Sequence, residues 1–373
     1  MKVLHLISSS GYFGAENVIV TLAQEQIKSG ICLFIGAFNN LQNPHLEITR
    51  RATEYNISIK IFDCYGQFDL KTLKQIRNFI NINKIDIIHS HGYKANFYTI
   101  FARLCSSVKI ITTCHNWITN CSKMKLYEKI DKMLLRYFDK IVVVSELLKA
   151  EVQRSGIPIN KIVTICNSIN TESFISKNTN FEKLRESLGI NINEKVVITV
   201  GRVTSEKGHI YLLEAAEKVL KNFNRVKFLI VGDGKLLNFL KVKARELKIE
   251  NKVIFAGMRN DIPDLLNIGD VFILPSLTEG MPISLLEAMA TRKAIIASRV
   301  GAIPKMIDDR VSGLLVSPGN VGELANSISE LIDDNERINF LGSNAFSKVN
   351  SEFSSKKMTE EYFKQYRLLK SDN

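Results

Sequence analysis

The chain has few of the features that mark membrane-spanning or disulfide-linked proteins. No apolar run approaches the roughly 18 residues of a spanning helix, and residues 3–7 are too short for a signal-peptide core. The six cysteines form no Cys-x-x-Cys pair and no zinc-ribbon spacing. We therefore expect free thiols in a reducing cytoplasm, where disulfides are rare.

Several ligand-binding signatures are also missing. The sequence contains neither a Gly-x-Gly-x-x-Gly fingerprint nor a Walker A loop, so neither a dinucleotide nor an ATP site is expected. It carries a formal net charge of +12 but no recognisable nucleic-acid-binding motif. A nucleic acid is therefore not expected as a partner, and the charge needs another explanation.

Length and charge give the first positive indications. A chain of 373 residues exceeds one ordinary core and predicts two domains of roughly 150 to 200 residues. Residues 1–185 hold 24 Lys and Arg against 14 Asp and Glu, whereas the rest hold 26 against 24. The first half therefore carries +10 and the second only +2. This asymmetry favours an anionic partner, such as a phospholipid surface or a lipid-phosphate acceptor.

Short apolar runs alternate with amphipathic helical patterns along both halves. Such alternation is typical of α/β proteins with parallel sheets covered by helices on both faces. We expect two such sheets facing each other across a cleft, joined by the polar residues 170–195. The expected strands are 3–7, 31–37, 57–62, 85–89, 109–113, 140–144, 162–165, 195–200, 228–231, 252–255, 271–274, 294–297 and 313–316.

The first half offers two candidate binding elements at strand ends. Residues 8–16, which include Gly14, join the first strand to a helix over 17–28, a geometry common in phosphate sites. His115 directly follows another strand, where a neutral imidazole suits a sugar hydroxyl or developing charge. The alternatives are glycines that merely turn the chain and a satisfied histidine beneath a loop.

A second histidine pattern is weaker. His89 and His91 are spaced like half of a metal site, but no third and fourth ligands are evident in the sequence. We therefore predict no metal site, and interpret His89 as a packing residue and His91 as a crevice residue.

The second half offers charged loops at two strand ends. Arg202 and Lys207 follow a strand and precede a helix starting near His209, which suits a diphosphate leaving group. Two solvated surface cations are the alternative for this loop taken alone.

Residues 275–290 combine carboxylates with a helix start. Glu279 precedes a helix expected over 282–291, with proline near its first position, and Glu287 lies about two turns further. The backbone amides of Met281, Ile283 and Ser284 are donors suited to phosphate or sugar hydroxyls. Together these groups favour a nucleotide sugar, which carries both.

Residues 121–140 form a basic amphipathic pattern. Six lysines and arginines alternate with apolar residues at helical spacing. Such a helix either lies on an anionic bilayer or packs on the core with its basic side solvated, and the sequence favours neither.

Several motifs together resemble the retaining glycosyltransferases of family four, of bacterial surface-polysaccharide type. Paired glutamates with seven residues between them, within Glu-Gly-Met-Pro-Ile-Ser-Leu-Leu-Glu-Ala-Met-Ala, are the most specific piece. The resemblance covers essentially the whole chain, and its other motifs are Phe13-Gly14-Ala15-Glu16, Asn167-Ser168-Ile169-Asn170, Gly201-Arg202, Lys207-Gly208, Val231-Gly232-Asp233-Gly234 and Phe255-Ala256-Gly257.

This resemblance implies a fold and roles for individual residues. The fold is GT-B, with an acceptor-side domain over 1–175, a nucleotide-sugar domain over 190–354 and a last helix over 355–373 that packs back on the first domain. Glu279 would contact the donor sugar and Glu287 the ribose, while Arg202, Lys207 and Gly14 would approach the diphosphate. His115 would lie near the transferred sugar.

The implied activity is metal-independent and needs no cofactor. A hexose or N-acetylhexosamine would pass from a nucleoside diphosphate, most simply UDP, to a hydroxyl of a lipid-linked or surface glycan. The enzyme would be cytoplasmic, peripheral on the inner face of the membrane. The alternatives are a GT-B epimerase or phosphorylase, or a membrane-associated scaffold that binds sugar nucleotides without turnover.

Two departures from the family pattern affect the expected contacts. Met281-Pro282 stands where an aromatic and a second glycine are usual, and proline lacks an amide hydrogen, so we expect fewer donors facing the sugar. Asn167-Ser168 replaces a usual Asn-Gly, so the turn there is expected to differ.

The absence of an Asp-x-Asp motif gives a first prediction. Turnover of a nucleotide sugar should be unchanged when a chelator such as EDTA is present, because protein cations rather than a metal would stabilise the leaving diphosphate. Initial rates with chelator and with added manganese test this. Strict dependence on manganese would contradict it.

Overall fold

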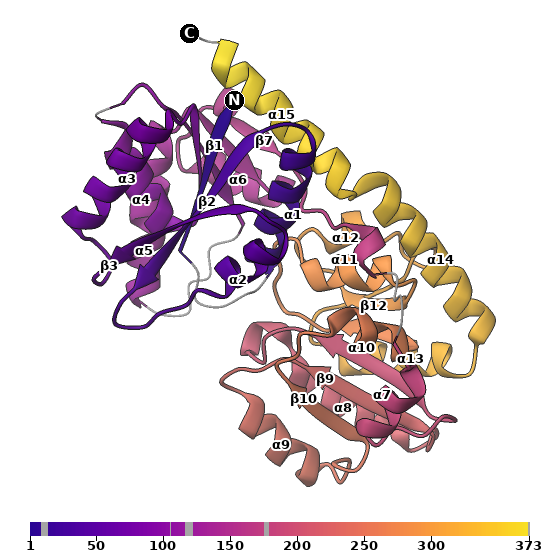
Figure 1. Cartoon of the computed structure of the whole chain (residues 1–373). Helices are drawn as coiled ribbons and strands as arrows, with labels where there is room; N and C mark the ends of the chain where they lie inside the picture. The colour runs from indigo at the N-terminus through magenta and orange to yellow at the C-terminus, as the bar shows by residue number, and fades with distance from the viewer. Residues whose placement is uncertain (9–13, 105, 116–121, 175–178, 372–373) are drawn as a thin grey trace. The chain divides into compact units, whose positions relative to one another are not determined.

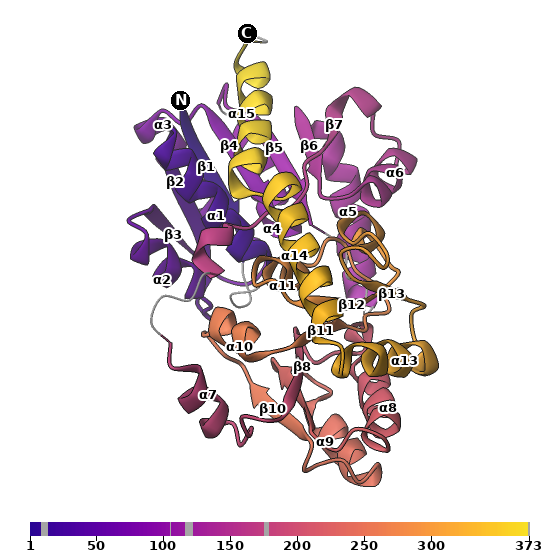
Figure 2. The same cartoon turned by 90° about the vertical axis from the view of Figure 1, so that its right-hand side faces the viewer.

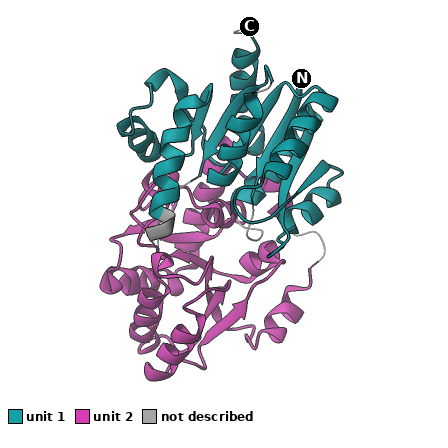
Figure 3. Ribbon diagram, turned by 90° about the vertical axis from the view of Figure 1, so that its left-hand side faces the viewer, with its two compact units in different colours: residues 1–168, 355–373 teal, residues 169–354 magenta. Residues whose placement is uncertain are grey.

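The computed structural model describes residues 1–8, 14–104, 106–115, 122–174 and 179–371. It divides into two compact units, residues 1–168 with 355–373 (unit 1) and residues 169–354 (unit 2) (Figure 3). The division precedes the expected end of the first domain at residue 175. The reason is that Ile169 already pairs with unit 2: it forms a bridge with Ser354, and its amide donates to Phe353 O at 3.0 Å.

Unit 1 contains a parallel sheet of seven strands in the order β3-β2-β1-β4-β5-β6-β7. These strands are labelled in Figure 2, and β1, β2, β3 and β7 also in Figure 1. Each expected strand is present, with ends that differ by a few residues. The chain forms β2 and β3 on one side of β1 and then crosses to the other side to form β4. β1 and β4 are therefore neighbours in the sheet, although β2 and β3 lie between them in sequence. The strands are β1 (Lys2–Ile7), β2 (Cys32–Asn40), β3 (Ser58–Cys64), β4 (Ile87–His91), β5 (Lys109–Cys114), β6 (Lys140–Val143) and β7 (Ile162–Thr164).

Helices connect the strands of unit 1, and the last helix of the chain also belongs to this unit. This helix, α15 (Ser355–Ser371), packs beside α1 (Gly14–Lys28) and buries Tyr362 and Tyr366 (Figure 2). α1 begins at Gly14, three residues before the expected start. The other helices are α2 (Glu47–Glu54), α3 (Leu70–Asn83), α4 (Tyr93–Arg103), α5 (Ser122–Leu134), α6 (Glu146–Arg154) and the 3₁₀ turns η1 (Leu135–Tyr137) and η2 (Ile159–Lys161).

Unit 2 contains a six-stranded parallel sheet in the order β10-β9-β8-β11-β12-β13. Its strands are β8 (Lys195–Val200), β9 (Val226–Val231), β10 (Val253–Gly257), β11 (Val271–Leu274), β12 (Ala294–Ser298) and β13 (Leu314–Val316). Its helices are α7 (Phe181–Ser187), α8 (His209–Leu220), α9 (Leu237–Glu246), α10 (Ile262–Ile268), α11 (Ile283–Ala290), α12 (Ile303–Met306), α13 (Val321–Ile332) and α14 (Asn335–Glu352), with the turns η3 (Thr171–Phe174) and η4 (Ser205–Lys207).

Both faces of the unit 2 sheet are buried, as a doubly covered parallel sheet requires. Phe228 and Ile273 face the cluster formed with α8 and α13, and the alternate residue Phe272 is equally buried on the opposite face. Each such side chain contributes roughly 2 kcal/mol through removal of apolar area from water. This explains why the strands read as continuous β-branched and aromatic runs.

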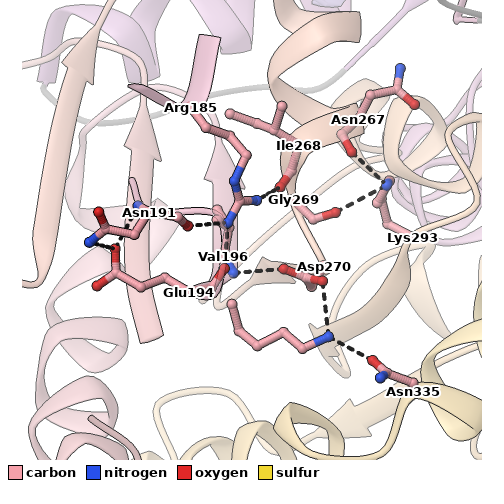
Figure 4. Close-up of polar contacts among 11 residues, drawn as sticks. Arg185, Asn191, Glu194, Val196, Asn267, Ile268, Gly269, Asp270, Lys293 and Asn335 are labelled. Atoms are coloured by element: carbon pink, nitrogen blue, oxygen red, sulfur yellow. Dashed lines mark hydrogen bonds and ion pairs between the residues drawn. The ribbon is translucent and has the colours of Figure 1, made fainter. Parts of the chain in front are cut away.

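Polar contacts tie the connecting segment to the amino ends of the strands in unit 2 (Figure 4). The Arg185 guanidinium donates to Ile268 O at 3.1 Å and to Asn191 O at 2.9 Å. Asp270 accepts from the Val196 amide at 2.8 Å and from Lys195 Nζ at 3.2 Å. The carboxyl ends of the strands form the opposite edge of the sheet, which is where open α/β sheets bind their ligands.

The expectations on cysteines and membrane spans can be compared with the structure. Cys32, Cys64, Cys114 and Cys166 are free thiols, while Cys105 and Cys121 lie outside the described residues. Among the described helices, none combines the length and apolar character needed to cross a bilayer.

Candidate active site

Two loops meet at the carboxyl edge of the unit 2 sheet. The chain runs outward from β8 to β9 and β10, and returns to the other side of β8 as β11. This reversal places the loops that follow β8 and β11 beside each other, at the position where open α/β sheets bind ligands. The Leu277 amide, in the second loop, donates to Glu206 O in the first at 2.8 Å.

Two glycines permit close packing around Glu279, one after β8 and one in the loop that follows β12. Gly208 has φ +68° and is the N-cap of α8, and a Cβ there would lie 2.0 Å from the carbonyl oxygen of Pro275. Gly301 has φ +58°, and its Cβ would lie 2.1 Å from Glu279 O. Only glycine tolerates both the left-handed backbone and the missing space. The backbone on both sides of Glu279 is therefore held in place.

Lys207 and Glu279 form an ion pair in this packed region. Lys207 Nζ lies 2.6 Å from Glu279 Oε1, and the side chains are only 14% and 9% exposed. Ser276 Oγ also donates to Glu279 Oε1 at 2.7 Å. A largely buried charge is costly without its partner, so each of these two groups fixes the position of the other.

Arg202 lies in the same loop but is more exposed. Its Nη2 is 3.3 Å from Glu206 Oε1, and 39% of its side chain is exposed. A pair of this kind contributes little to stability because water screens it. Arg202 can therefore change partners at low cost.

The helix that follows Glu279 starts one residue later than predicted. α11 begins at Ile283, and Pro282 is its N-cap, with ψ 123° and no side-chain cap. Pro282 lies just outside the helix and still lacks an amide hydrogen, so the N-cap position supplies no donor, and how many amides face the sugar stays a prediction. The amides of Ile283 and Ser284 occupy the first turn, where no acceptor exists within the helix. Met281 is 6% exposed and belongs to the buried part of the loop.

Glu287 lies on the second turn of α11 and is partly buried. Burial raises the pKa of its carboxyl group to about 7. Desolvation disfavours the carboxylate, so near neutral pH the group exists in both protonation states. It can accept or donate a hydrogen bond to a hydroxyl-bearing ligand.

The candidate residues of unit 1 lie at its own carboxyl edge. Gly14 is the first residue of α1, and the loop residues 9–13 before it lie outside the described residues, as does Trp117. His115 directly follows β5 and is half-buried. Burial lowers the pKa of His115 to about 4, so its imidazole is neutral at physiological pH.

Sequence reasoning missed the environment of His115. His5, on β1, is paired in register with His89 on β4, and His91 ends the same strand. The ring nitrogens of His5, His89 and His91 include atoms within 4.8 Å of one another. Strand register cannot be read from a single sequence, and the predicted crevice residue His91 is in fact 4% exposed. His89 is fully buried, as the packing interpretation required.

The basic helix over 121–140 is α5 followed by η1, and its exposed side is both apolar and basic. Four exposed apolar residues follow one another at spacings of four, three and four, which places them on one face. They are Leu126, Ile130, Met133 and Tyr137. Lys125, Lys129 and Arg136 are exposed beside them. The buried side instead carries Asp131, which accepts from Asn96 Nδ2 at 2.7 Å.

The two parallel-sheet units define a class, the GT-B architecture of glycosyltransferases. The family model described as glycosyl transferases group 1 matches residues 180–348, and that described as glycosyltransferase family 4 matches residues 13–173. The two models match successive halves of the chain, which therefore belongs to the family 4, group 1 glycosyltransferases.

Named relatives agree with this assignment. The chain is 29% identical, over 77% of its length and 76% of theirs, to a UDP-Gal:alpha-D-GlcNAc-diphosphoundecaprenol alpha-1,3-galactosyltransferase of Escherichia coli. It is 26% identical, over 80% and 78%, to an N-acetyl-alpha-D-glucosaminyl L-malate synthase of Bacillus anthracis.

Solved structures share the fold. A crystal structure of HepE from Anabaena, in complex with UDP and glucose, superposes with a TM-score of 0.87 at 21% identity, over 98% of this chain and 99% of that one. A glycosyltransferase from Rickettsia africae gives 0.84 at 22% identity, over 100% and 99%.

The structure thus brings some predicted site residues together within unit 2, whereas others belong to unit 1. Lys207 and Glu279 are in contact, and Arg202 lies in the same loop as Lys207. Glu287 stands on the helix that begins beside Glu279, with Ile283 and Ser284 in its first turn. Gly14 and His115 belong to unit 1, and their roles at the diphosphate and the sugar stay predictions.

The raised pKa of Glu287 predicts a pH-dependent effect on stability. Its folded-state pKa of about 7 exceeds the ordinary 4.5. The folded protein therefore loses stability as pH rises from 4.5 to about 7, because the group ionises readily in the unfolded chain but only at a cost in its buried position. Replacement by glutamine removes this loss. The stability gain of Glu287→Gln over wild type should grow by about 2 kcal/mol from about pH 5.5 to about pH 8.

Urea denaturation at the two pH values measures this gain. Glu323→Gln is the matched control, because hydrogen bonds from Ser317 lower the pKa of Glu323 below its ordinary 4.5, so its carboxylate is ionised in the folded and the unfolded chain at both pH values. The effect of that variant on stability should therefore be the same at the two pH values. A gain for Glu287→Gln that does not change with pH would show that Glu287 has an ordinary pKa.

Proposed function

We propose that the chain is a retaining transferase that moves a hexose or N-acetylhexosamine from a nucleoside diphosphate, most simply UDP, to a hydroxyl of a lipid-linked or surface glycan. The observation that carries the proposal is the ion pair of Lys207 with Glu279, 2.6 Å apart, beside the first turn of α11. A cation, a carboxylate and free helix amides suit the phosphates and hydroxyls of one nucleotide sugar.

The diphosphate would be held by positive groups. Lys207 is fixed by Glu279, while the exposed Arg202 can leave Glu206 for a phosphate oxygen. The amides of Ile283 and Ser284 add the positive end of a helix dipole. Charge develops on the diphosphate as the glycosidic bond breaks, and one well-placed donor commonly supplies about 3 kcal/mol of transition-state stabilisation. No metal is needed for this step.

The carboxylates would hold the two ends of the donor. Glu279 accepts hydrogen bonds from sugar hydroxyls through the oxygen that Lys207 does not occupy. Glu287, with a pKa raised to about 7 by burial, contacts the ribose hydroxyls as acceptor or donor. His115 would contact the transferred sugar as a neutral imidazole. No side chain is assigned as a nucleophile, and the retained configuration rests on the family resemblance.

Relatives support the donor and acceptor classes. The Escherichia coli relative is named for UDP-galactose and a diphosphoundecaprenol acceptor, and HepE was solved with UDP and glucose. A lipid-linked acceptor also fits the basic first half of the chain. We infer from these features that the enzyme works in the cytoplasm at an anionic membrane surface.

Turnover assays test the proposed reaction. Purified protein is incubated with a panel of nucleotide sugars, with and without lipid-linked acceptor, and the released nucleoside diphosphate and product anomer are measured. We expect one UDP-sugar to react, with retention, only when acceptor is present. Sugar isomerised without acceptor would identify an epimerase, use of inorganic phosphate a phosphorylase, and binding without turnover a scaffold.

Variants of the ion pair sharpen this test. Lys207→Ala and Glu279→Ala should each lower kcat roughly 100- to 1,000-fold, because each loses a charged contact with the donor. The more exposed pair of Lys221 with Glu217, 2.7 Å apart at the end of α8, supplies matched controls. Lys221→Ala and Glu217→Ala should keep wild-type turnover. Full activity of Lys207→Ala in a folded protein would overturn the assignment.

The exposed face of α5 predicts membrane association. Apolar residues flanked by lysines lie in the headgroup region of anionic bilayers, and each basic residue contributes about 1 kcal/mol there. Vesicles containing phosphatidylglycerol should sediment the wild-type protein more than neutral vesicles do. The triple variant Leu126→Ser, Ile130→Ser, Met133→Ser should lose this difference.

The control for α5 comes from α9 in unit 2. Phe239 and Val242 are exposed on α9, which also carries lysines. The variant Phe239→Ser, Val242→Ser should sediment like wild type. Equal loss in both variants would show general adhesion rather than a surface specific to α5.

A further inference from the structure

A chain of buried hydrogen bonds connects the last helix of the protein to His115. Gln26 Nε2, on α1, donates to the Tyr366 hydroxyl of α15 at 3.3 Å. Gln26 Oε1 faces His5 Nε2 at 3.0 Å, and His5 Nδ1 faces His91 Nε2 at 3.0 Å. His91 Nδ1 then faces His115 Nε2 at 3.4 Å. All five residues belong to unit 1.

The members of this chain are shielded from water. His5, Gln26 and Tyr366 have no exposed surface, and His91 is 4% exposed. Burial lowers the pKa of His5 to about 4 and that of His91 well below its ordinary value. Each imidazole is therefore neutral and carries one N–H donor and one acceptor nitrogen. A series of such rings must place all its donors in the same direction.

The orientation of the Gln26 amide sets that direction. Its oxygen accepts from His5, so His5 carries its proton on Nε2 and accepts on Nδ1. His91 must then donate from Nε2 and accept on Nδ1, which requires His115 to donate from Nε2. The ring of His115 is left with a lone pair on Nδ1. If the amide were flipped, every tautomer along the chain would reverse.

A second branch holds the Gln26 amide in place. The Tyr366 hydroxyl accepts from Gln26, so its single proton is available to His89 Nδ1, 2.7 Å away. His89 Nε2 is 2.7 Å from Thr113 Oγ1, which is 2.9 Å from the Tyr362 hydroxyl. Both tyrosines come from α15. The C-terminal helix thus supplies the hydroxyl that accepts from the Gln26 amide.

We propose that Gln26, His5 and His91 are positioning residues that fix the tautomer of His115 with Nε2 protonated and Nδ1 free to accept. The value of this arrangement rests on the proposed function, in which His115 contacts the transferred sugar. An acceptor nitrogen binds a sugar hydroxyl or takes its proton, whereas the other tautomer presents a donor there. α15 therefore acts on the chemistry of a residue remote from it in sequence.

The tautomer can be observed without any substrate. Selective ¹⁵N-histidine labelling distinguishes protonated from unprotonated ring nitrogens, and His115→Phe identifies the signals of His115. The wild-type protein should show His115 with Nε2 protonated. In Gln26→Met, which removes both polar atoms at similar volume, and in His91→Phe, which breaks the chain next to His115, the signals should shift toward a mixture of tautomers.

Two further variants keep the test decisive. Tyr366→Phe removes one hydroxyl and frees the Gln26 amide, so it should give the same mixture even if a larger change prevents folding. Gln24→Met, on the same helix but outside the chain, should leave His115 unchanged. An unchanged His115 tautomer in Gln26→Met, His91→Phe and Tyr366→Phe would overturn the proposal.

Kinetics and metal analysis complete the experiment. Gln26→Met and Tyr366→Phe should lower kcat about tenfold or more while KM for the donor stays constant, because only the acceptor nitrogen is affected. Equimolar zinc in the purified protein would overturn the relay, since a metal held by His5, His89 and His91 needs their nitrogens as ligands. If no donor is turned over, the proposed function fails, but the tautomer measurement still decides the relay.

Discussion

Parallel pairing around the central strands is the constraint on which the rest of the structure depends. In unit 2, β8 pairs with β9 on one side and β11 on the other, so the loops that leave β8 and β11 start at the same edge. Gly208 then lets the first loop touch Pro275 in the second. Without this reversal, Lys207 and Glu279, which are 72 residues apart, would not meet.

The electrostatics of the site follow from its partial burial. Lys207 and Glu279 are too poorly hydrated to stand alone, and each provides the charge that the other needs. Glu287 has a pKa raised by burial, so the fold pays a cost in stability at neutral pH for keeping a carboxyl group there. A desolvation cost of this kind is expected where a site serves ligand binding rather than stability.

Unit 1 shows the same principle with neutral groups. Histidines on β1 and β4 are buried, and desolvation keeps them uncharged. Their hydrogen-bonding capacity is satisfied by one another and by groups on α1 and α15. A buried polar network of this type is favourable only when every member is paired, which specifies one arrangement of the helices on the sheet.

Much of the fold could be predicted from the sequence. All expected strands were found, because runs such as residues 195–200 are rich in β-branched residues and short enough to exclude helices. Helix starts were less accurate. α1 begins earlier than its apolar pattern suggested, and α11 begins after Pro282 because that residue adopts an extended conformation. The first unit ends sooner than expected because Ile169 pairs with Ser354.

The sequence by itself determined the class of the protein, its strands and the residues with the right chemistry, because periodicity and motif spacing are local properties. Tertiary structure alone decided which of these residues are partners. Burial of Glu287, the contact of Lys207 with Glu279 and the alignment of His5 with His89 depend on strand order and register. These are long-range properties, and one chain without its fold carries no direct record of them.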